Sequence, residues 1–162
     1  MKPWQHLQMY DDLTEALDFA GIKKVARVDR GDGLLVLVPE EQSGLGSLLG
    51  FLLHLQRLMG DQDPRHTKLR LRVTVSHGVL TFSEHGWYGA DLNTAIRLLD
   101  SDSLRQIMAD HGVCLAVAVT QQIHDALGNT RPRGFRPEFH QTHAATKDGA
   151  ISAWIYASGG SV

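Results

Sequence analysis

The sequence has little cysteine. Its 162 residues contain a single one, Cys114, which lies in the apolar run GVCLAVAV. One cysteine excludes a disulfide within the chain and is typical of proteins from a reducing compartment. We therefore expect a cytoplasmic protein in which Cys114 is a small, buried hydrophobic residue.

Long apolar runs and an excess of one charge are also absent. The longest apolar stretch, LGSLLGFLLHLQRLM, is interrupted by polar residues and is too short to cross a bilayer. The start MKPWQHLQMYDD lacks the apolar segment of a signal peptide. The formal net charge is -2 and the basic residues are scattered. We expect neither a membrane segment nor a nucleic acid partner.

No internal repeat or low-complexity segment is present. A chain of this length can bury a core large enough to fold unaided. We expect one domain over residues 1–157 and a flexible tail over 158–162, where the sequence is rich in Gly and Ser.

What the sequence does contain is an alternation of helical and strand patterns. Apolar spacing predicts helices over 7–20, about 44–59, 91–100, about 101–110 and after Thr120. Period-two patterns and turn residues predict strands over 24–29, 34–38, 69–76 and 113–119, with hairpin turns at Gly31–Gly33 and Lys147–Gly149. The segment VLTFSEHGWYG continues as a hairpin partner or a loop. The predicted fold is an α+β sandwich with helices against one mostly antiparallel sheet.

Asp32, in the Gly-Asp-Gly turn, is the first candidate functional residue. Asp and Gly are common in tight turns, so Asp32 could serve the turn alone. A carboxylate is also a preferred ligand of hard divalent ions, so Asp32 could bind a metal.

Asn93 and Arg97 are four residues apart in the clearest helical pattern, so both face the same way. Each has a simpler interpretation: Asn93 as polar surface, and Arg97 as a surface arginine paired with Asp100 or Asp102. Lys147 could likewise be an exposed lysine of the last turn.

The histidines and aromatic residues give weaker signals. His77 and His85 suggest a metal site or an acid and base, but histidines beside a strand are usually structural. His140 and His143 lack a third ligand at a recognisable spacing, so we expect no zinc site. The aromatic pair at 87–88 could stack on a base, or pack as an interface anchor.

The order of these motifs resembles the class III nucleotidyl cyclase catalytic domain, over nearly the whole chain. The motifs are the Gly-Asp-Gly hairpin, the strand LRVTVSHG, the helix with Gly89-x3-Asn93-x3-Arg97, and a last hairpin with Lys147. The stretches DRGDG…LVP, N-x-A-x-RLLD and K…AW also resemble those of divergent actinobacterial cyclase-homology proteins.

This resemblance implies a ferredoxin-like core that forms a head-to-tail dimer, with nucleotide sites between two chains. It implies that Asp32 is the second metal-binding aspartate, for Mg²⁺ or Mn²⁺. It further implies that Asn93 orients the ribose of a purine nucleoside triphosphate, that Arg97 stabilises charge on its phosphates, and that Lys147 holds the triphosphate.

The sequence also departs from the family pattern. The family carries its first metal-binding aspartate on a strand before the first helix, and this strand is missing here; Asp11 and Asp12 lie within the helix and do not match that position. The purine-reading Lys and Asp are replaced by Val28 and Gly86. We therefore expect weak or no cyclase activity from the chain alone.

Three hypotheses follow. The first is a degenerate cyclase-like domain that dimerises and binds a nucleotide as a regulatory or signalling module. The second is an active cyclase, complete as a heterodimer or from a longer start, that converts a nucleoside triphosphate to a cyclic nucleotide and pyrophosphate. The third is a structural partner protein without nucleotide binding.

Overall fold

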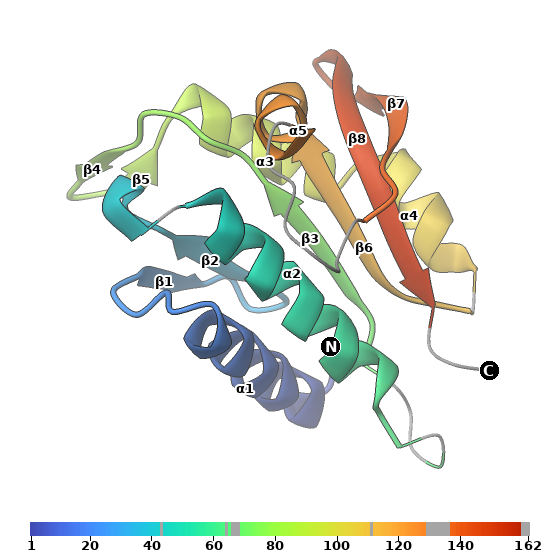
Figure 1. The fold of residues 1–162 in the computed structure, drawn as a ribbon. Helices are drawn as coiled ribbons and strands as arrows, with labels where there is room; N and C mark the ends of the chain where they lie inside the picture. Colours follow the sequence, from blue (N-terminus) through green and yellow to red (C-terminus); the bar gives the residue numbers. More distant parts are fainter. Residues whose placement is uncertain (43, 64, 66–68, 111, 129–136, 160–162) are drawn as a thin grey trace. The chain divides into compact units, whose positions relative to one another are not determined.

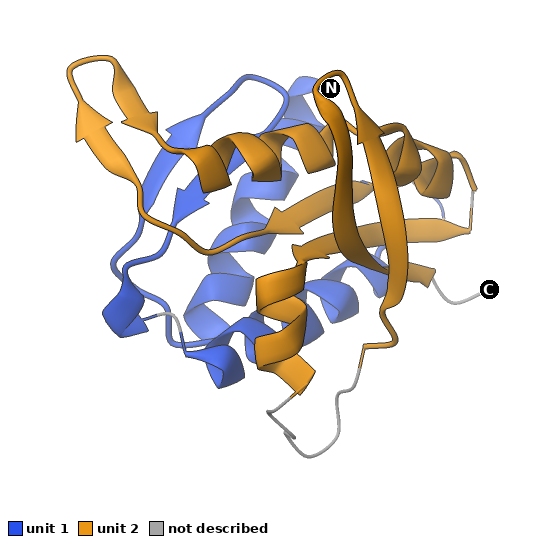
Figure 2. Ribbon diagram, turned by 90° about the horizontal axis from the view of Figure 1, so that it is seen from above, with its two compact units in different colours: residues 1–69, 132–135 blue, residues 70–131, 136–162 orange. Residues whose placement is uncertain are grey.

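The structure is a computed structural model that describes residues 1–42, 44–63, 65, 69–110, 112–128 and 137–159. The contacts divide the described residues into two compact units, one up to Leu69 and the other from Arg70 onward (Figure 2). Each unit is described by itself below.

The first unit is a helix pair with a short hairpin. Its elements are α1 (Pro3–Phe19), β1 (Ala26–Asp29), β2 (Leu34–Leu37), a 3-10 turn (Glu40–Gln42) and α2 (Leu45–Gly60). The two helices pack against each other, and each buries a stripe of apolar residues at helical spacing. The buried residues are Met9, Leu13, Ala16 and Leu17 on α1 and Leu49, Leu52, Leu55 and Met59 on α2.

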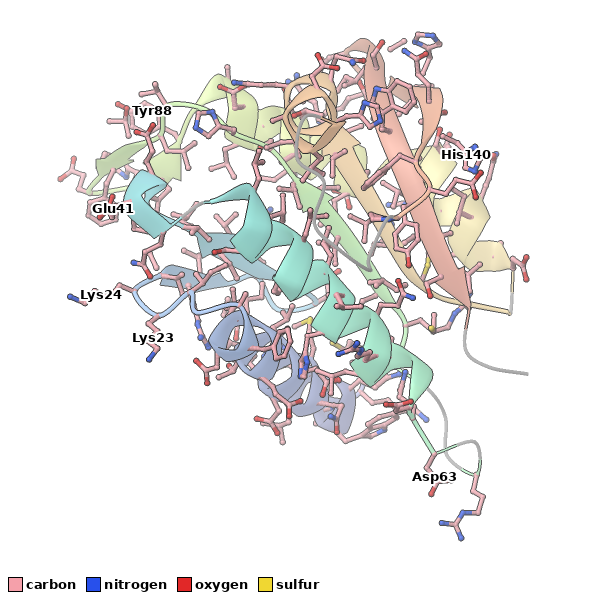
Figure 3. The ribbon with its side chains drawn as sticks, in the orientation of Figure 1. Lys23, Lys24, Glu41, Asp63, Tyr88 and His140 are labelled. Atoms are coloured by element: carbon pink, nitrogen blue, oxygen red, sulfur yellow. The ribbon has the colours of Figure 1, made fainter. Side chains whose placement is uncertain are left out.

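Two glutamine side chains in the first unit form hydrogen bonds with backbone groups at the ends of helices and strands. Gln42 Oε1 accepts hydrogen bonds from the backbone N–H groups of Lys23 and Lys24, which lie before β1 (Figure 3). Gln62, just after α2, accepts from Leu69 N–H at 2.6 Å and donates to the carbonyls of Leu69 and Met59 at 2.8 and 2.9 Å. The Gln62 amide thus pairs with both backbone groups of Leu69, as a neighbouring strand would.

The second unit is built on a four-stranded sheet of order β3-β6-β8-β7. Its elements are β3 (Leu71–Val75), β4 (Thr81–Ser83), β5 (Gly86–Tyr88), α3 (Ala90–Leu99), α4 (Asp102–Ala109), β6 (Val113–Thr120), α5 (Gln121–Gly128), β7 (His140–Thr146) and β8 (Gly149–Gly159). β3 and β6 run parallel, with Leu71 opposite Leu115, whereas β6–β8 and β7–β8 are antiparallel.

Helices α3 and α4 lie along one face of this sheet (Figure 1). The strands present alanines to the helices: Leu104 of α4 packs on Ala116 and Ala118, and Leu98 of α3 packs on Ala144 and Ala153. Small residues under each leucine let the helix backbones approach the sheet closely, which holds α3 and α4 at a defined height.

The α+β class predicted from the sequence is confirmed, but the expectation of one sheet was wrong. Among the described residues the strands form three sheets: the four-stranded one, the β1–β2 hairpin and the β4–β5 hairpin. The segment left open as hairpin partner or loop is therefore a small hairpin of its own. β8 also continues through Ser158 and Gly159, which the sequence had assigned to the tail, while 160–162 lie outside the described residues.

Cys114 is buried, as predicted, at the start of β6. No helix among the described residues is long and apolar enough to cross a membrane.

Replacement of Gln62 by Ala should destabilise the protein. The change leaves the partly buried N–H and C=O groups of Leu69 without their partner, and such losses cost about 1–3 kcal/mol. Urea unfolding measures the effect, with Gln106→Ala on the exposed side of α4 as the matched control, which should change stability by less than about 0.5 kcal/mol. Equal stabilities of the two variants would contradict this role of Gln62.

Asp12, a buried carboxyl on α1, should make stability depend on pH. Burial raises the pKa of Asp12 above its usual value, against the hydrogen bond that Gln8 Nε2 donates at 2.8 Å. The folded protein then holds this proton more tightly than the unfolded chain, so stability falls as pH rises above about 4. We expect the stability of Asp12→Asn relative to wild type to grow between about pH 3 and about pH 7 in urea unfolding. A difference that shrinks with pH would contradict it.

Candidate functional site

A row of side chains from β3 and the residue after it fixes the position of α3. Three alternate residues each donate a hydrogen bond to an α3 carbonyl. The pairs are Arg72 Nη1 to Leu99 O at 3.0 Å, Thr74 Oγ1 to Ala95 O at 2.9 Å and Ser76 Oγ to Asp91 O at 3.1 Å. We call this set the β3–α3 ladder.

The ladder works because two backbone periods nearly agree. Alternate residues of a strand are spaced by about 6.6 Å, and residues four apart in a helix advance by about 6 Å. Donors at every second strand position therefore stay in step with carbonyls at every fourth helix position, with the helix antiparallel to β3. The ladder sets both the direction and the register of α3.

The N-terminal end of α3 is also held by a close approach. A Cβ atom on Gly78 would overlap the Asp91 carboxylate and lie 2.6 Å from Asp91 Cβ, so a larger residue would force the backbone to shift where the chain leaves β3 and passes the start of α3. At the other end, Leu98 is fully buried on its two alanines. These contacts leave the polar face of α3, with Asn93 and Arg97, in a fixed place.

A pocket of about 640 Å³ lies against this face of α3. Its lining comes from α3, the start of α4 and the end of β7 with its turn: Asn93, Ile96, Arg97, Asp100, Ser101, Asp102, Ala145, Thr146 and Lys147. The volume falls within the range of small-molecule sites. Three of the four residues predicted as site residues, Asn93, Arg97 and Lys147, thus line one pocket.

Lys147 reaches this pocket from the β7–β8 turn. Thr146 Oγ1 accepts from Asp148 N–H at 3.3 Å and donates to Gly149 O at 2.7 Å. Gly149 has φ 115°, in the left-handed region that favours glycine, so the turn closes there. Lys147 and Asp148 are both exposed at the tip of this turn.

Arg97 forms an ion pair with a residue of the β7–β8 turn. Its Nη2 lies 2.9 Å from Asp148 Oδ2, and the two side chains are 40% and 48% exposed. The sequence had offered Asp100 or Asp102 as the partner of Arg97, and this was wrong. Both aspartates line the pocket, but among the described residues Arg97 forms its ion pair with Asp148. Asn93 is exposed, one helical turn before Arg97.

Asp32 belongs to the first unit and is exposed at the tip of the β1–β2 hairpin. The side chain that serves this turn is that of Asp29, which accepts from Gly31 N–H at 2.8 Å and lies 3.1 Å from His6 Nε2. These contacts, the Gly31 hydrogen bond first, lower the pKa of Asp29. The Asp32 carboxylate has no hydrogen-bond or ion-pair partner within the described part of the chain.

The weaker candidates lie outside the pocket lining. His77 Nδ1 is 3.4 Å from Gln122 Nε2, and His143 Nδ1 is 3.2 Å from Ser152 Oγ on the neighbouring strand. Trp87 packs on Phe82 within the β4–β5 hairpin, whereas Tyr88 is exposed at the end of β5 (Figure 3). In the ranges that the structure describes, no three His, Cys, Asp or Glu side chains are grouped to hold a metal ion.

Sequence reasoning missed Asp148, the residue in direct contact with Arg97. The Lys147-Asp148-Gly149 sequence predicted the turn, but its contact with a helix some fifty residues earlier depends on how the hairpin packs. The one available signal was the position of Asp148 next to Lys147, which already counted as a candidate.

No family model, curated protein or solved structure matches this chain. The residues and their geometry carry the functional argument.

Replacement of Thr74 by Val should weaken the ladder at its centre. Valine keeps the shape but removes the hydrogen bond to Ala95 O, which costs about 0.5–1.5 kcal/mol of unfolding free energy. Thr94→Val is the matched control, since the Thr94 hydroxyl bonds to Ala90 O within its own helix and contributes little. Chemical unfolding of both variants measures the difference, and a Thr94→Val loss as large as that of Thr74→Val would show that the ladder is unimportant.

Proposed function

We propose that this chain is a degenerate class III nucleotidyl cyclase-like domain that binds a purine nucleoside triphosphate in the pocket beside α3. In this proposal it acts as a dimerising regulatory or signalling module with weak or no cyclase activity. The observation that carries the proposal is the gathering of Asn93, Arg97 and Lys147 in one pocket, from segments about fifty residues apart.

The chemistry of these side chains suits a phosphorylated ligand. The Arg97 guanidinium offers several donors in one plane and binds phosphate oxygens in a bidentate manner. The Lys147 ammonium adds a second positive charge at the end of a flexible side chain, and the Asn93 amide can both donate to and accept from a sugar hydroxyl. Because Asn93 and Arg97 are one turn apart on a fixed helix, they can contact adjacent groups of one ligand.

The charges of the pocket explain why Mg²⁺ or Mn²⁺ belongs to the proposal. Two cationic side chains and two carboxylates, Asp100 and Asp102, line the pocket, so its formal charges cancel. A nucleoside triphosphate carries a divalent ion on its phosphates, and this combination suits a lining of mixed charge better than a bare polyanion does.

The residues do not fit the two-metal centre that cyclisation needs. Asp32 is a single exposed carboxylate in the first unit, and hard divalent ions require several oxygen ligands. We therefore derive no catalytic step through a metal ion, and we propose nucleotide binding with weak or no cyclisation.

Titration calorimetry of ATP and GTP with Mn²⁺ tests the proposal. We expect wild-type protein to bind at least one of them, and Arg97→Ala to bind roughly 10- to 100-fold more weakly, because a hydrogen-bonded charge contact is lost. Arg105→Ala, an exposed arginine on α4 outside the pocket lining, is the matched control and should bind as wild type does.

The other hypotheses predict different results. Cyclic nucleotide found by chromatography of the mixture would show an active cyclase. The absence of binding by wild-type protein would refute the nucleotide site and leave the structural partner. Equal losses in Arg97→Ala and Arg105→Ala would place the ligand elsewhere.

A further inference from the structure

The two residues at the tip of the β7–β8 turn have opposite relations to an anion in the pocket. Lys147 lines the pocket and attracts a negatively charged ligand. Asp148, its neighbour, places a carboxylate oxygen 2.9 Å from Arg97 Nη2. The guanidinium that we assign to the ligand is therefore already occupied by a carboxylate of the same chain.

A carboxylate and a phosphate use the same donors of an arginine. Both accept hydrogen bonds from guanidinium N–H groups in similar geometry, so a ligand phosphate and Asp148 compete for Arg97. The phosphates of a polyphosphate bring more charge and more acceptor oxygens than one carboxylate does.

The pair is exposed enough to be displaced. Both side chains are about half exposed to solvent, and exposed ion pairs contribute little free energy. The turn that carries Asp148 is closed by local hydrogen bonds of Thr146, and Asp148 joins this turn to α3 through its ion pair with Arg97. The pair can open without disturbing the core on Leu98.

We propose that Asp148 is an internal competitor that holds Arg97 in the ligand-free protein and is displaced when an anionic ligand binds. This inference rests on the proposed nucleotide site and adds its regulation. Because Lys147 and Asp148 share one turn, release of Asp148 moves the turn, and ligand binding is thereby communicated to the β7–β8 hairpin.

Removal of the Asp148 charge should strengthen binding. The probe is inorganic tripolyphosphate with Mg²⁺ in buffer of low salt, titrated by calorimetry into the full chain. Asp148→Asn, which keeps the shape and suits a turn, should bind about two- to fivefold more tightly than wild type, as expected from the strength of an exposed ion pair. The amide NMR signals of Asp148 and Gly149 should shift on binding to wild type.

Asp102→Asn is the matched control, because it also removes one negative charge near the ligand, here from the pocket lining, and leaves the ion pair of Arg97 with Asp148 intact. A gain in Asp102→Asn equal to that in Asp148→Asn would overturn the inference, since general charge would then suffice. In an Arg97→Ala background, Asp148→Asn should give no more gain than Asp102→Asn does.

The inference and the proposed function can fail separately. Binding that Arg97→Ala abolishes but Asp148→Asn leaves unchanged or weakens would overturn the competitor and keep the site. The absence of tripolyphosphate and ATP binding in wild type and in Asp148→Asn would overturn both. Binding by Asp148→Asn alone would support both.

Discussion

The hydrogen bonds from β3 to the carbonyls of α3 are the constraint on which the candidate site depends. Arg72, Thr74 and Ser76 reach three α3 carbonyls at intervals of four residues, so α3 can neither slide along β3 nor rotate without breaking several bonds together. Each bond contributes only about 1 kcal/mol, but their common register makes a shifted helix lose all of them. The orientation of Asn93 and Arg97 follows from this register.

The apolar packing and the ladder have different tasks in the second unit. Leu98 on Ala144 and Ala153 gives α3 its burial, yet a leucine on a surface of alanines tolerates small displacements. Hydrogen bonds are directional and select one displacement among those that packing permits. A similar division occurs at α4: Leu104 packs on alanines of β6, while Arg70 Nε donates to Val113 O at 2.9 Å and Nη2 donates to Asp110 O at 2.6 Å beyond the helix end.

The sequence predicts the strand and the helix of this arrangement, but not which groups their polar side chains contact. The alternation in LRVTVS indicated a strand with one polar side, and periodicity placed Asn93 and Arg97 on one helix face. Local pattern does not say what covers a polar strand face; here it is the backbone of α3. It also does not pair Arg97 with Asp148, because that contact depends on the packing of a hairpin formed much later in the chain. For Asp32, the sequence correctly placed the turn, whereas its metal role stays a prediction.

Rigidity is distributed unequally around the Arg97 pair. On one side, the β3–α3 ladder holds α3 on β3, the chain at Gly78 packs closely against Asp91, and Leu98 is buried on alanines. Moving Arg97 together with α3 would therefore break several interactions at once. On the other side, Asp148 stands at an exposed turn whose own bonds run through Thr146. Motion concentrates where few contacts resist it. In the proposed binding of an anionic ligand, we therefore expect the turn to move and α3 to keep Asn93 and Arg97 in place.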